Sequence, residues 1–454
     1  MKRKYDYLHL ICFILLLGCS SEDTEYVPLQ IQTNPDAVQV YQNSYVDISL
    51  FANDANIPET GTLRLTNPNH GSVSILNNNT PNNPKDDIVR FTATGNFTGT
   101  DSFVYTICTT NNTCATETVT VTILPPTPVV YNPEALPYPK LSDYNFFKGE
   151  LKNLEPVSGV VPYDLNSPLF SDYAHKKRFV WMPNGTKATY NSDFTPLDFP
   201  VGAFLIKSFY YDNVLPNNAT KIIETRLMYF TESGWEFAKY IWNEEQTDAT
   251  FSNEGAVVNI NWSEAGTTKS VDYRVPSRAE CFTCHNKFGT PIPIGPKPQN
   301  LNKNYTYADG TANQLQKWAE SGYLDPNYPG SINSTVAWDD TLEPLELRAR
   351  SYIDINCAHC HSEESYCEYR PMRFAFNETE LDSNLGICVE PDTNIGSAYT
   401  HIISPGNPSA SVAFFRMSSV EEQYRMPIIG RTLQHTEGVA LIEDWINSLT
   451  NRCD

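Results

Sequence analysis

Short alternations of apolar and polar residues mark the chain from residue 32 to residue 124. The clearest is TVTVTI at 118–123, where β-branched residues repeat with a period of two, and Asn, Gly and Pro separate neighbouring runs. A period of two sends successive side chains to opposite faces of a strand. Several short strands of this kind predict a β-sandwich over residues 32–124.

A second region of longer aromatic and β-branched runs spans residues 141–277, after a proline-rich stretch at 125–140. The runs at 201–211, 221–230 and 235–242 predict strands, and together they predict a second β-rich sandwich domain. Because proline favours an extended and semi-rigid chain, we interpret residues 125–140 as a linker that holds the two domains apart.

The apolar spacing changes to a helical period in residues 278–454. The segment 345–355 places its apolar residues on one helical face, and the segment 439–449 does the same. Thr436 is the expected N-cap of the second of these helices. The pattern therefore predicts a mainly α-helical domain at the C-terminus of a multidomain chain, in agreement with its 454 residues.

The predicted helical domain contains two copies of the string CxxCH, at 281–285 and 357–361. This string is the attachment signature of c-type haem. Two thiols three residues apart can form thioether bonds to one porphyrin edge, and the histidine that follows is then the proximal iron ligand. A zinc or redox CxxC pair that precedes a histidine by coincidence is the alternative. We expect two covalently bound haems held by Cys281, Cys284, His285, Cys357, Cys360 and His361.

The sixth ligand of each iron decides whether a haem only carries electrons or also reacts with a small molecule. For the second haem we expect Met426, which precedes the predicted closing helix, ahead of Met417 and Met372. No methionine lies between the two boxes, so the first haem takes its sixth ligand from elsewhere or has none. The candidates for the first haem are His175, Met182, Met228, His401 and His435, whereas His359 is expected to be an exposed spacer residue.

Several further stretches resemble a known family. They are PLFSDY at 168–173, FPVG at 199–202, ETR at 224–226, WN at 242–243 with QTDA at 246–249, PIGPK at 293–297, QL at 314–315 and RAR at 348–350. With the two boxes, they make residues from about 162 to 445 resemble a family of two-haem bacterial c-type cytochromes whose physiological role is largely unassigned. The resemblance implies haem binding, a cytochrome c domain and electron transfer. In the first domain, GTDSFVY at 99–105 resembles the immunoglobulin-like or cadherin-like domains of bacterial surface proteins, which implies a spacer or adhesion role.

The N-terminus resembles a bacterial lipoprotein signal peptide. A basic start precedes an apolar run at 8–17 that is too short to span a bilayer, and the string LLGC ends at Cys19. The resemblance implies that residues 1–18 are removed and that Cys19 is acylated, and the acidic residues that follow are similar to a surface-export signal. We therefore expect an outer-membrane lipoprotein that faces the cell surface or the periplasm.

The formal net charge of −21 excludes nucleic acid as a class of partner. Removing residues 1–18, which hold three basic residues and one acidic residue, makes the charge −23. So acidic a protein favours a basic redox partner and salt-sensitive encounters. A dehydrogenase or another cytochrome is the expected class of partner, and the acylated cysteine is the expected contact with the membrane.

The other cysteines are typical of an oxidising compartment. Cys108 and Cys114 flank a predicted hairpin turn, and we expect them to form a disulfide. Cys367, Cys388 and Cys453 remain; the expected pair is Cys367 with Cys388, which leaves Cys453 free, although spacing alone does not fix the pairing.

These features favour an electron carrier: a lipid-anchored di-haem c-type cytochrome that works outside the cytoplasm. A di-haem peroxidase-like enzyme with an open position at the first haem is the alternative, and the first haem's sixth ligand discriminates between the two. A redox subunit that takes electrons from a sugar or alcohol dehydrogenase is a third, weaker hypothesis.

Overall fold

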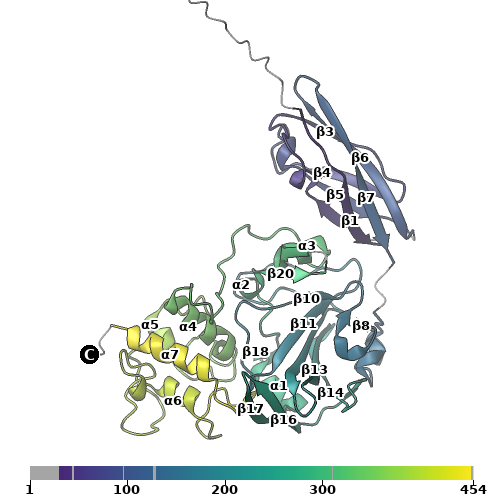
Figure 1. Cartoon of the computed structure of the whole chain (residues 1–454). Helices are drawn as coiled ribbons and strands as arrows, with labels where there is room; N and C mark the ends of the chain where they lie inside the picture. Colours follow the sequence, from purple (N-terminus) through teal and green to yellow (C-terminus); the bar gives the residue numbers. More distant parts are fainter. Residues whose placement is uncertain are drawn as a thin grey trace, which may run out of the picture.

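The computed structural model describes residues 30–42, 45–95, 97–125, 129–308, 310–450 and 453. Three bodies follow one another along the chain (Figure 1): a first β-domain, a β-rich lobe at residues 129–336 and a helical lobe at residues 345–450. The expected signal peptide at 1–18 and Cys19 lie outside the described residues. No helix within the described part of the chain is long and apolar enough to cross a membrane.

The first domain is a sandwich of two sheets that enclose one apolar core. Alternate residues point inward, and Phe91, Phe103 and Tyr105 are almost completely buried between the sheets, as the period of two predicts. The four-stranded sheet has the order β1–β7–β6–β3 and the three-stranded sheet the order β2–β5–β4. Their bounds are β1 Asp36–Tyr41, β2 Tyr45–Ile48, β3 Gly61–Leu65, β4 Gly71–Leu76, β5 Ile88–Ala93, β6 Gly99–Thr109 and β7 Cys114–Leu124.

A predicted disulfide and a buried tyrosine each tie segments of this domain together. Cys108 and Cys114 face each other across the β6–β7 hairpin and form a disulfide, which confirms the expected pair. The buried Tyr105 donates its hydroxyl proton to Asp54 Oδ2 at 2.6 Å, and so attaches a long strand to the loop after β2.

The strands of the β-rich lobe form one antiparallel sheet rather than two packed sheets. Its order is β10–β11–β12–β13–β14–β15, and the hairpin β16–β17 pairs with the end of β12 and packs on Phe209 and Tyr211. The predicted strands at 201–211, 221–230 and 235–242 correspond to β12, β13 and β14. The bounds are β10 Val161–Tyr163, β11 His175–Trp181, β12 Phe204–Val214, β13 Ala219–Thr231, β14 Gly234–Trp242, β15 Ala249–Phe251, β16 Ala256–Glu264 and β17 Thr267–Val275.

Both faces of this sheet are covered by other segments of the chain. One face, with Phe204 and Ile206, packs against residues 129–160. Val129 and Tyr138 are buried in that core, so residues 129–140 are not the free linker that their prolines suggest; aromatic burial outweighs the extended preference of proline. Short elements in this covering are η3 Pro133–Ala135, η4 Leu141–Tyr144, β8 Phe147–Lys148, η5 Leu151–Asn153 and β9 Glu155–Pro156.

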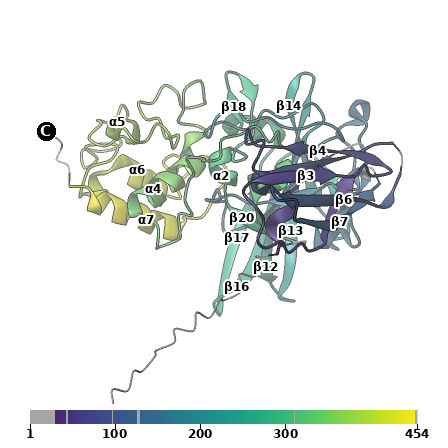
Figure 2. The same cartoon turned by 90° about the horizontal axis from the view of Figure 1, so that it is seen from above.

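The C-terminal region divides between the two lobes, so it is not one mainly helical domain. Residues 278–336 pack on the second face of the sheet, where Leu301, Leu315 and Trp318 share a core with strand residues. Figure 2 shows the helical lobe beside the β-rich lobe and away from the first domain. The elements that cover the sheet are α1 Arg278–Cys284, β18 Asn286–Lys287, β19 Thr290–Pro291, α2 Pro298–Leu301, β20 Asn304–Tyr307, β21 Gly310–Asn313 and α3 Gln314–Glu320.

The helical lobe has its own core around Trp445. Helices are present at both predicted positions, as α4 Leu345–Ile353 and α7 Thr436–Ser448. Thr436 is the first residue of α7 and not its N-cap; His435 takes that place without a side-chain cap. The Tyr173 oxygen, from the other lobe, accepts from the Thr436 backbone N–H instead. The remaining elements are a π-helical turn Asp354–Ala358, α5 Asp382–Leu385, η7 Pro408–Ala410 and α6 Val412–Ser418.

The predicted pairing of Cys367 with Cys388 is wrong. Cys388 forms its disulfide with Cys453, and Cys367 is a buried free thiol. The folded chain brings the segment after α7 back to the loop after α5, and this proximity of segments 65 residues apart is not visible in cysteine spacing.

We predict that Cys453→Ser lowers the free energy of unfolding of the helical lobe by about 4 kcal/mol, because a closed loop of this length restricts the unfolded chain strongly. Cys114→Ser, which opens the much shorter Cys108–Cys114 loop, is the matched control and should destabilise the first domain by only about 2 kcal/mol. Urea unfolding and a non-reducing peptide map test both. A linked peptide that contains Cys367 and Cys388 would contradict the assignment.

Candidate functional site

The two CxxCH boxes are carried by different lobes. The first lies on α1, which begins at a capping box formed by Ser277 and Glu280 and packs on β14. A capping box satisfies orphan N–H groups at the helix start and so fixes where the helix begins. The second box lies where α4 widens into its π-helical turn, a distortion that often occurs at functional sites.

The boxes meet at the junction between the lobes. One ligand atom from each of Cys284, His359 and Cys360 lies within 4.8 Å of the other two. The hydrogen bond to Cys360 lowers the pKa of the Cys284 thiol. The second cysteine of each box therefore lies beside that of the other, and His359 is part of this contact rather than an exposed spacer.

Each box histidine lines its own cavity. We call the cavity of His285 the first cavity and that of His361 the second; with the open space at their mouths included, their volumes are about 1340 and 1150 Å³. Four residues line both cavities, which are therefore neighbours with a common wall: Cys284, His359, Pro427 and Ile429.

Both histidines are in the state that a metal ligand requires. Burial lowers the pKa of His285 to about 3 and that of His361 to about 4, so both imidazoles are neutral at pH 7. His285 Nδ1 lies 2.9 Å from the Ile292 carbonyl oxygen. Such a bond fixes the ring and leaves Nε2 for a metal. His361 Nδ1 is buried without a hydrogen-bond partner among the described residues.

The second cavity contains all three methionines that the sequence offers for it. Met372, Met417 and Met426 line it together with Cys357 and His361. The Met426 segment is held by Arg431, which donates to the carbonyl oxygens of Met426 and Leu433 at 3.0 Å. A buried guanidinium that bridges several carbonyls gives this loop a defined shape.

The two leading candidates for the first cavity do not reach it. The His175 side chain is 60% exposed and lies 4.0 Å from Asp212, and Met182 is completely buried in the core beside α3. His401 bonds to Thr400 and His435 to Tyr352, and neither lines the first cavity. Met228 is the candidate that does line it.

Four basic residues line the first cavity, and sequence reasoning assigned none of them to it: Arg278 on α1, and Lys207, Arg226 and Lys239 on the sheet. The three on the sheet lie on neighbouring strands and point to the same face. The period of two within each strand was the available signal, but it does not show which strands are neighbours or how they are aligned.

Residues 170–173, within the PLFSDY stretch, join the β-rich lobe to the helical lobe. Asp172, only 2% exposed, accepts from the backbone N–H groups of Thr432 and Leu433 at 2.7 and 2.8 Å and from the Thr432 hydroxyl at 3.0 Å. The Phe170 N–H donates to Asn356 Oδ1 at 2.9 Å. One short segment thus fixes both the loop after Met426 and the turn that carries the second box.

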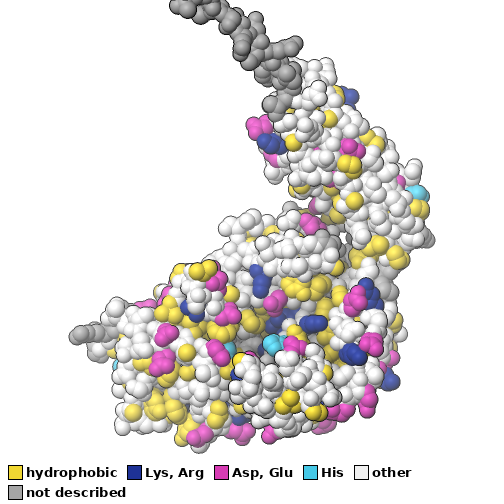
Figure 3. All heavy atoms as spheres, viewed as in Figure 1, with side chains coloured by type: hydrophobic (Ala, Val, Ile, Leu, Met, Phe, Trp, Pro, Cys, Tyr) yellow, Lys and Arg dark blue, Asp and Glu magenta, His cyan; other side chains and the backbone are white. Residues whose placement is uncertain are grey.

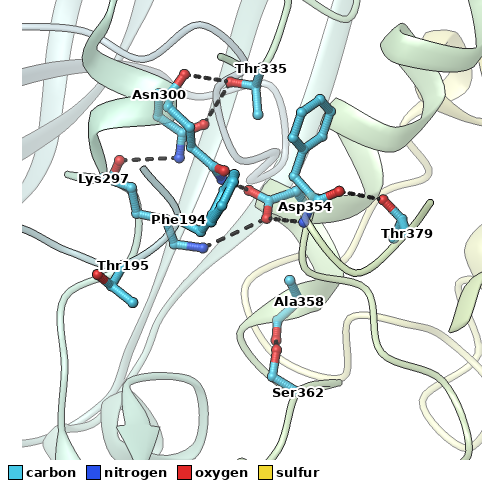
Figure 4. Close-up of polar contacts among 12 residues, drawn as sticks. Phe194, Thr195, Lys297, Asn300, Thr335, Asp354, Ala358, Ser362 and Thr379 are labelled. Carbon is cyan, nitrogen blue, oxygen red and sulfur yellow. Dashed lines mark hydrogen bonds and ion pairs between the residues drawn. The ribbon is translucent and has the colours of Figure 1, made fainter. Parts of the chain in front are cut away.

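A second buried carboxylate also joins the lobes, but it belongs to the helical lobe and its donors come from the β-rich lobe. Asp354, in the helical lobe, accepts from Gln299 Nε2 at 3.1 Å, and Lys297 Nζ lies 3.6 Å from its other oxygen. Figure 4 shows Lys297 pointing from the β-rich lobe toward Asp354, next to the Asn300–Thr335 hydrogen bond that supports the Lys297 loop. Asp354 lies three residues before Cys357, so this contact positions the second box against the first.

The comparisons with known proteins concern the first domain. A family model described as a bacterial Ig domain matches residues 28–122, so this part of the chain is a bacterial immunoglobulin-like domain. No curated protein matches the chain. Among solved structures, PcdhgB3 EC1-4 in 50 mM HEPES is 8% identical and matches 53% of this chain and 73% of its own, with a TM-score of 0.16. Sidekick-1 immunoglobulin domains 1-4 is 6% identical over 54% and 75%, also with a TM-score of 0.16. At these scores neither likeness supports an inference.

We predict that Asp172→Ala lowers the free energy of unfolding by about 3 kcal/mol, because several donors in the lobe junction lose a charged acceptor. It should also expose the 419–433 segment to limited proteolysis. Asp212→Ala, which removes a carboxylate that bonds within the β-rich lobe only, is the control and should change neither measurement by much. If the two variants changed the free energy of unfolding and the proteolysis equally, Asp172 would not be the residue that joins the lobes.

Proposed function

We propose that the protein is a lipid-anchored di-haem c-type cytochrome that transfers electrons outside the cytoplasm. The observation that carries the proposal is the contact between the two CxxCH boxes at the wall between two neighbouring cavities. Two cofactors attached there would have neighbouring edges. A protein that only stores one haem, or that binds two haems for separate purposes, has no need of this arrangement.

The residues present fit two covalently attached haems. Cys281 and Cys284 would attach the first and Cys357 and Cys360 the second, and the neutral imidazoles of His285 and His361 would be the proximal ligands. A bound haem supplies a reversible one-electron couple at its iron. Met426 is the proposed sixth ligand in the second cavity, and its loop is already held by Arg431.

The chain's own residues would control what reaches the irons. Pro427 and Ile429 contribute apolar groups to the wall between the cavities, beside Cys284 and His359, and would keep water out of it. A dry wall keeps the local dielectric low, which makes the potential of each site sensitive to nearby charges. The rigid joint through Asp172 and Asp354 keeps the separation between the two boxes constant, as repeated electron transfer between fixed sites requires.

Two other functions have an observation in their favour. A di-haem peroxidase-like enzyme is favoured by the first cavity, because His175 and Met182 do not line it, and an iron there that Met228 also left without a sixth ligand could react with peroxide. A metal site of the zinc type is favoured by the grouping of Cys284, His359 and Cys360, which are ligands that zinc prefers. Haem content and EPR spectra distinguish the electron carrier, the peroxidase-like enzyme and the zinc site from one another.

The proposed location is the outer membrane, with acylated Cys19 as the anchor and the immunoglobulin-like domain as a spacer. The proposed partner is a basic redox protein such as a dehydrogenase or another cytochrome. The net charge of −21 supports a basic partner. On the face drawn in Figure 3, acidic side chains lie along both lobes and would contribute to this attraction.

The function is tested by haem content and low-temperature EPR of the oxidised mature protein. We predict two haems per chain and two low-spin ferric signals, because both irons of an electron carrier are six-coordinate. A stoichiometric high-spin signal would favour the peroxidase-like enzyme. A matured sample with bound zinc and no haem would overturn the proposal.

His285→Ala and His361→Ala should each lose or severely perturb one haem, because each removes a proximal ligand. His175→Ala is the matched control, since that side chain is exposed and outside both cavities, and it should retain both haem spectra. Two unaltered haem spectra in either box variant would show that the box histidine is not a ligand.

Leucine substitutions at the three cavity methionines identify the second haem's sixth ligand. We predict that Met426→Leu removes the thioether–iron charge-transfer band and lowers the potential of one haem, because a thioether ligand raises the potential. Met417→Leu and Met372→Leu should keep the band, since these side chains would act as packing. Loss of the band in either of those two variants, and not in Met426→Leu, would reassign the ligand.

A further inference from the structure

Four basic residues form a continuous row across the central sheet of the β-rich lobe. Arg178 on β11 is opposite Lys207 on β12, Lys207 is opposite Arg226 on β13, and Arg226 is opposite Lys239 on β14. Like charges directly opposite each other destabilise a sheet. The chain has only 32 Lys and Arg residues against 53 Asp and Glu residues. The concentration of four cations at one site, two of them buried and two partly buried, therefore favours a partner of opposite charge.

Two of the four cations in this row are paired with carboxylates of the chain. Arg226 forms two hydrogen bonds to Glu224, which is completely buried, and Arg178 Nη1 donates to Asp164 at 2.6 Å. Lys239 donates to the carbonyl oxygens of Glu254 and Pro276 instead. These contacts leave positive charge in the row that no acidic side chain neutralises.

The unsatisfied part of the row is at Lys207. Its ammonium group lies 4.8 Å from the Phe209 ring and has no hydrogen bond or ion pair within the described part of the chain. Next to it, Arg178 is 5% exposed and its Nη2 is a buried donor without a partner. Burial, followed by the charge of Arg178, lowers the pKa of Lys207 well below its usual value. Among the described residues, Lys207 therefore lacks an acceptor on the side of the first cavity that it lines, and the neighbouring Arg178 has one N–H group without an acceptor.

We propose that Lys207 binds a carboxylate group in the first cavity, and that this group is a propionate of a haem attached at Cys281 and Cys284. The inference rests on the proposed function for the identity of the haem. The carboxylate chemistry itself rests on the row. An ionised carboxylate is the acceptor with which lysine and arginine form their strongest hydrogen bonds.

The distance along the row agrees with this assignment. The helix α1, which carries Cys281, packs on β14 at the Lys239 end of the row. Lys207 is two strands farther on, about 10 Å away at the usual strand spacing. The propionates leave a porphyrin from the edge opposite the groups that form thioethers, so those of a haem attached at Cys281 and Cys284 would point away from Cys281. Lys207 is the cavity-lining cation farthest from α1, and it is the one without a partner.

A diffusible carboxylate, such as the acid group of a small substrate, is the other source of the same chemistry. The two sources differ in whether the acceptor is already present in the haem-loaded protein. If the propionates fill the row, added acetate finds no site. If the row is open, acetate binds to it and perturbs the first haem.

The test uses the mature haem-loaded protein and the variants Lys207→Gln, Lys207→Arg and Lys177→Gln. Lys177 lies on β11 of the same sheet, is exposed and does not line the cavity, so its variant is the control for loss of one charge. Haem content is measured first. Resonance Raman spectra then report the propionate bending modes, spectroelectrochemistry reports the two potentials, and acetate is titrated into each protein.

We expect Lys207→Gln to retain two haems and to shift one propionate bending mode to lower frequency. The ratio of reduced to oxidised first haem at a fixed potential should fall about tenfold, or roughly 59 mV, because removal of a nearby cation favours the ferric state. The second haem should not change. Lys207→Arg should restore the wild-type spectrum, and Lys177→Gln should match it.

Four results would overturn the assignment. Unaltered Raman modes and potentials in Lys207→Gln would remove Lys207 from the propionates. Saturable acetate binding that Lys207→Gln abolishes would assign the row to a diffusible carboxylate, and a high-spin spectrum in that variant would place the amine of Lys207 on the iron. A wild-type protein without haem would overturn the proposed function as well, so the haem count distinguishes the two failures.

Discussion

The reciprocal exchange of buried carboxylates between the two lobes is the constraint on which the site depends. Asp172 extends from the β-rich lobe to the loop after Met426, and Asp354 in the helical lobe accepts from Gln299 of the β-rich lobe. A buried carboxylate without its donors would be strongly unfavourable. Each lobe therefore satisfies a charge of the other only when the two are correctly docked, and docking brings the two CxxCH boxes into contact.

The same junction explains why the two cavities differ in character. The second cavity lies mainly within the helical lobe and is lined mostly by methionines and aliphatic residues, with Arg370, Asp392 and Arg416 also in its wall, whereas the first lies against a sheet face with a row of cations. An apolar wall with a thioether favours the reduced state of a haem. Because an uncompensated cation also favours the reduced state, neutralisation of the row by a carboxylate would lower the first potential relative to the second. The difference would give electron flow between the boxes a direction.

The local sequence pattern predicted the individual strands and helices well, but it predicted poorly how they pack together. The strands near 201–211 and 221–230, the helices α4 and α7 and the Cys108–Cys114 disulfide follow from period, propensity and proximity in sequence. The Cys388–Cys453 pair and the burial of Val129 and Tyr138 do not, because each depends on segments that meet only after folding. The CxxCH strings identified the site's cysteines and histidines, but the contact between the two boxes requires the docked lobes.

The cationic row shows why a sheet can encode a site that sequence reading misses. Arg178, Lys207, Arg226 and Lys239 are spread over 62 positions of the chain, and the sheet register alone puts them opposite one another. A shift of one residue in any strand would turn its cation to the opposite, apolar face, where an unpaired charge would be severely destabilising. The sheet register therefore places the four cations in one row, and the cost of an unpaired cation on the apolar face disfavours any other register. Glu224 and Asp164 neutralise two members within the protein and backbone carbonyls bind Lys239, so the sheet holds Lys207 where a bound acid would complete the set.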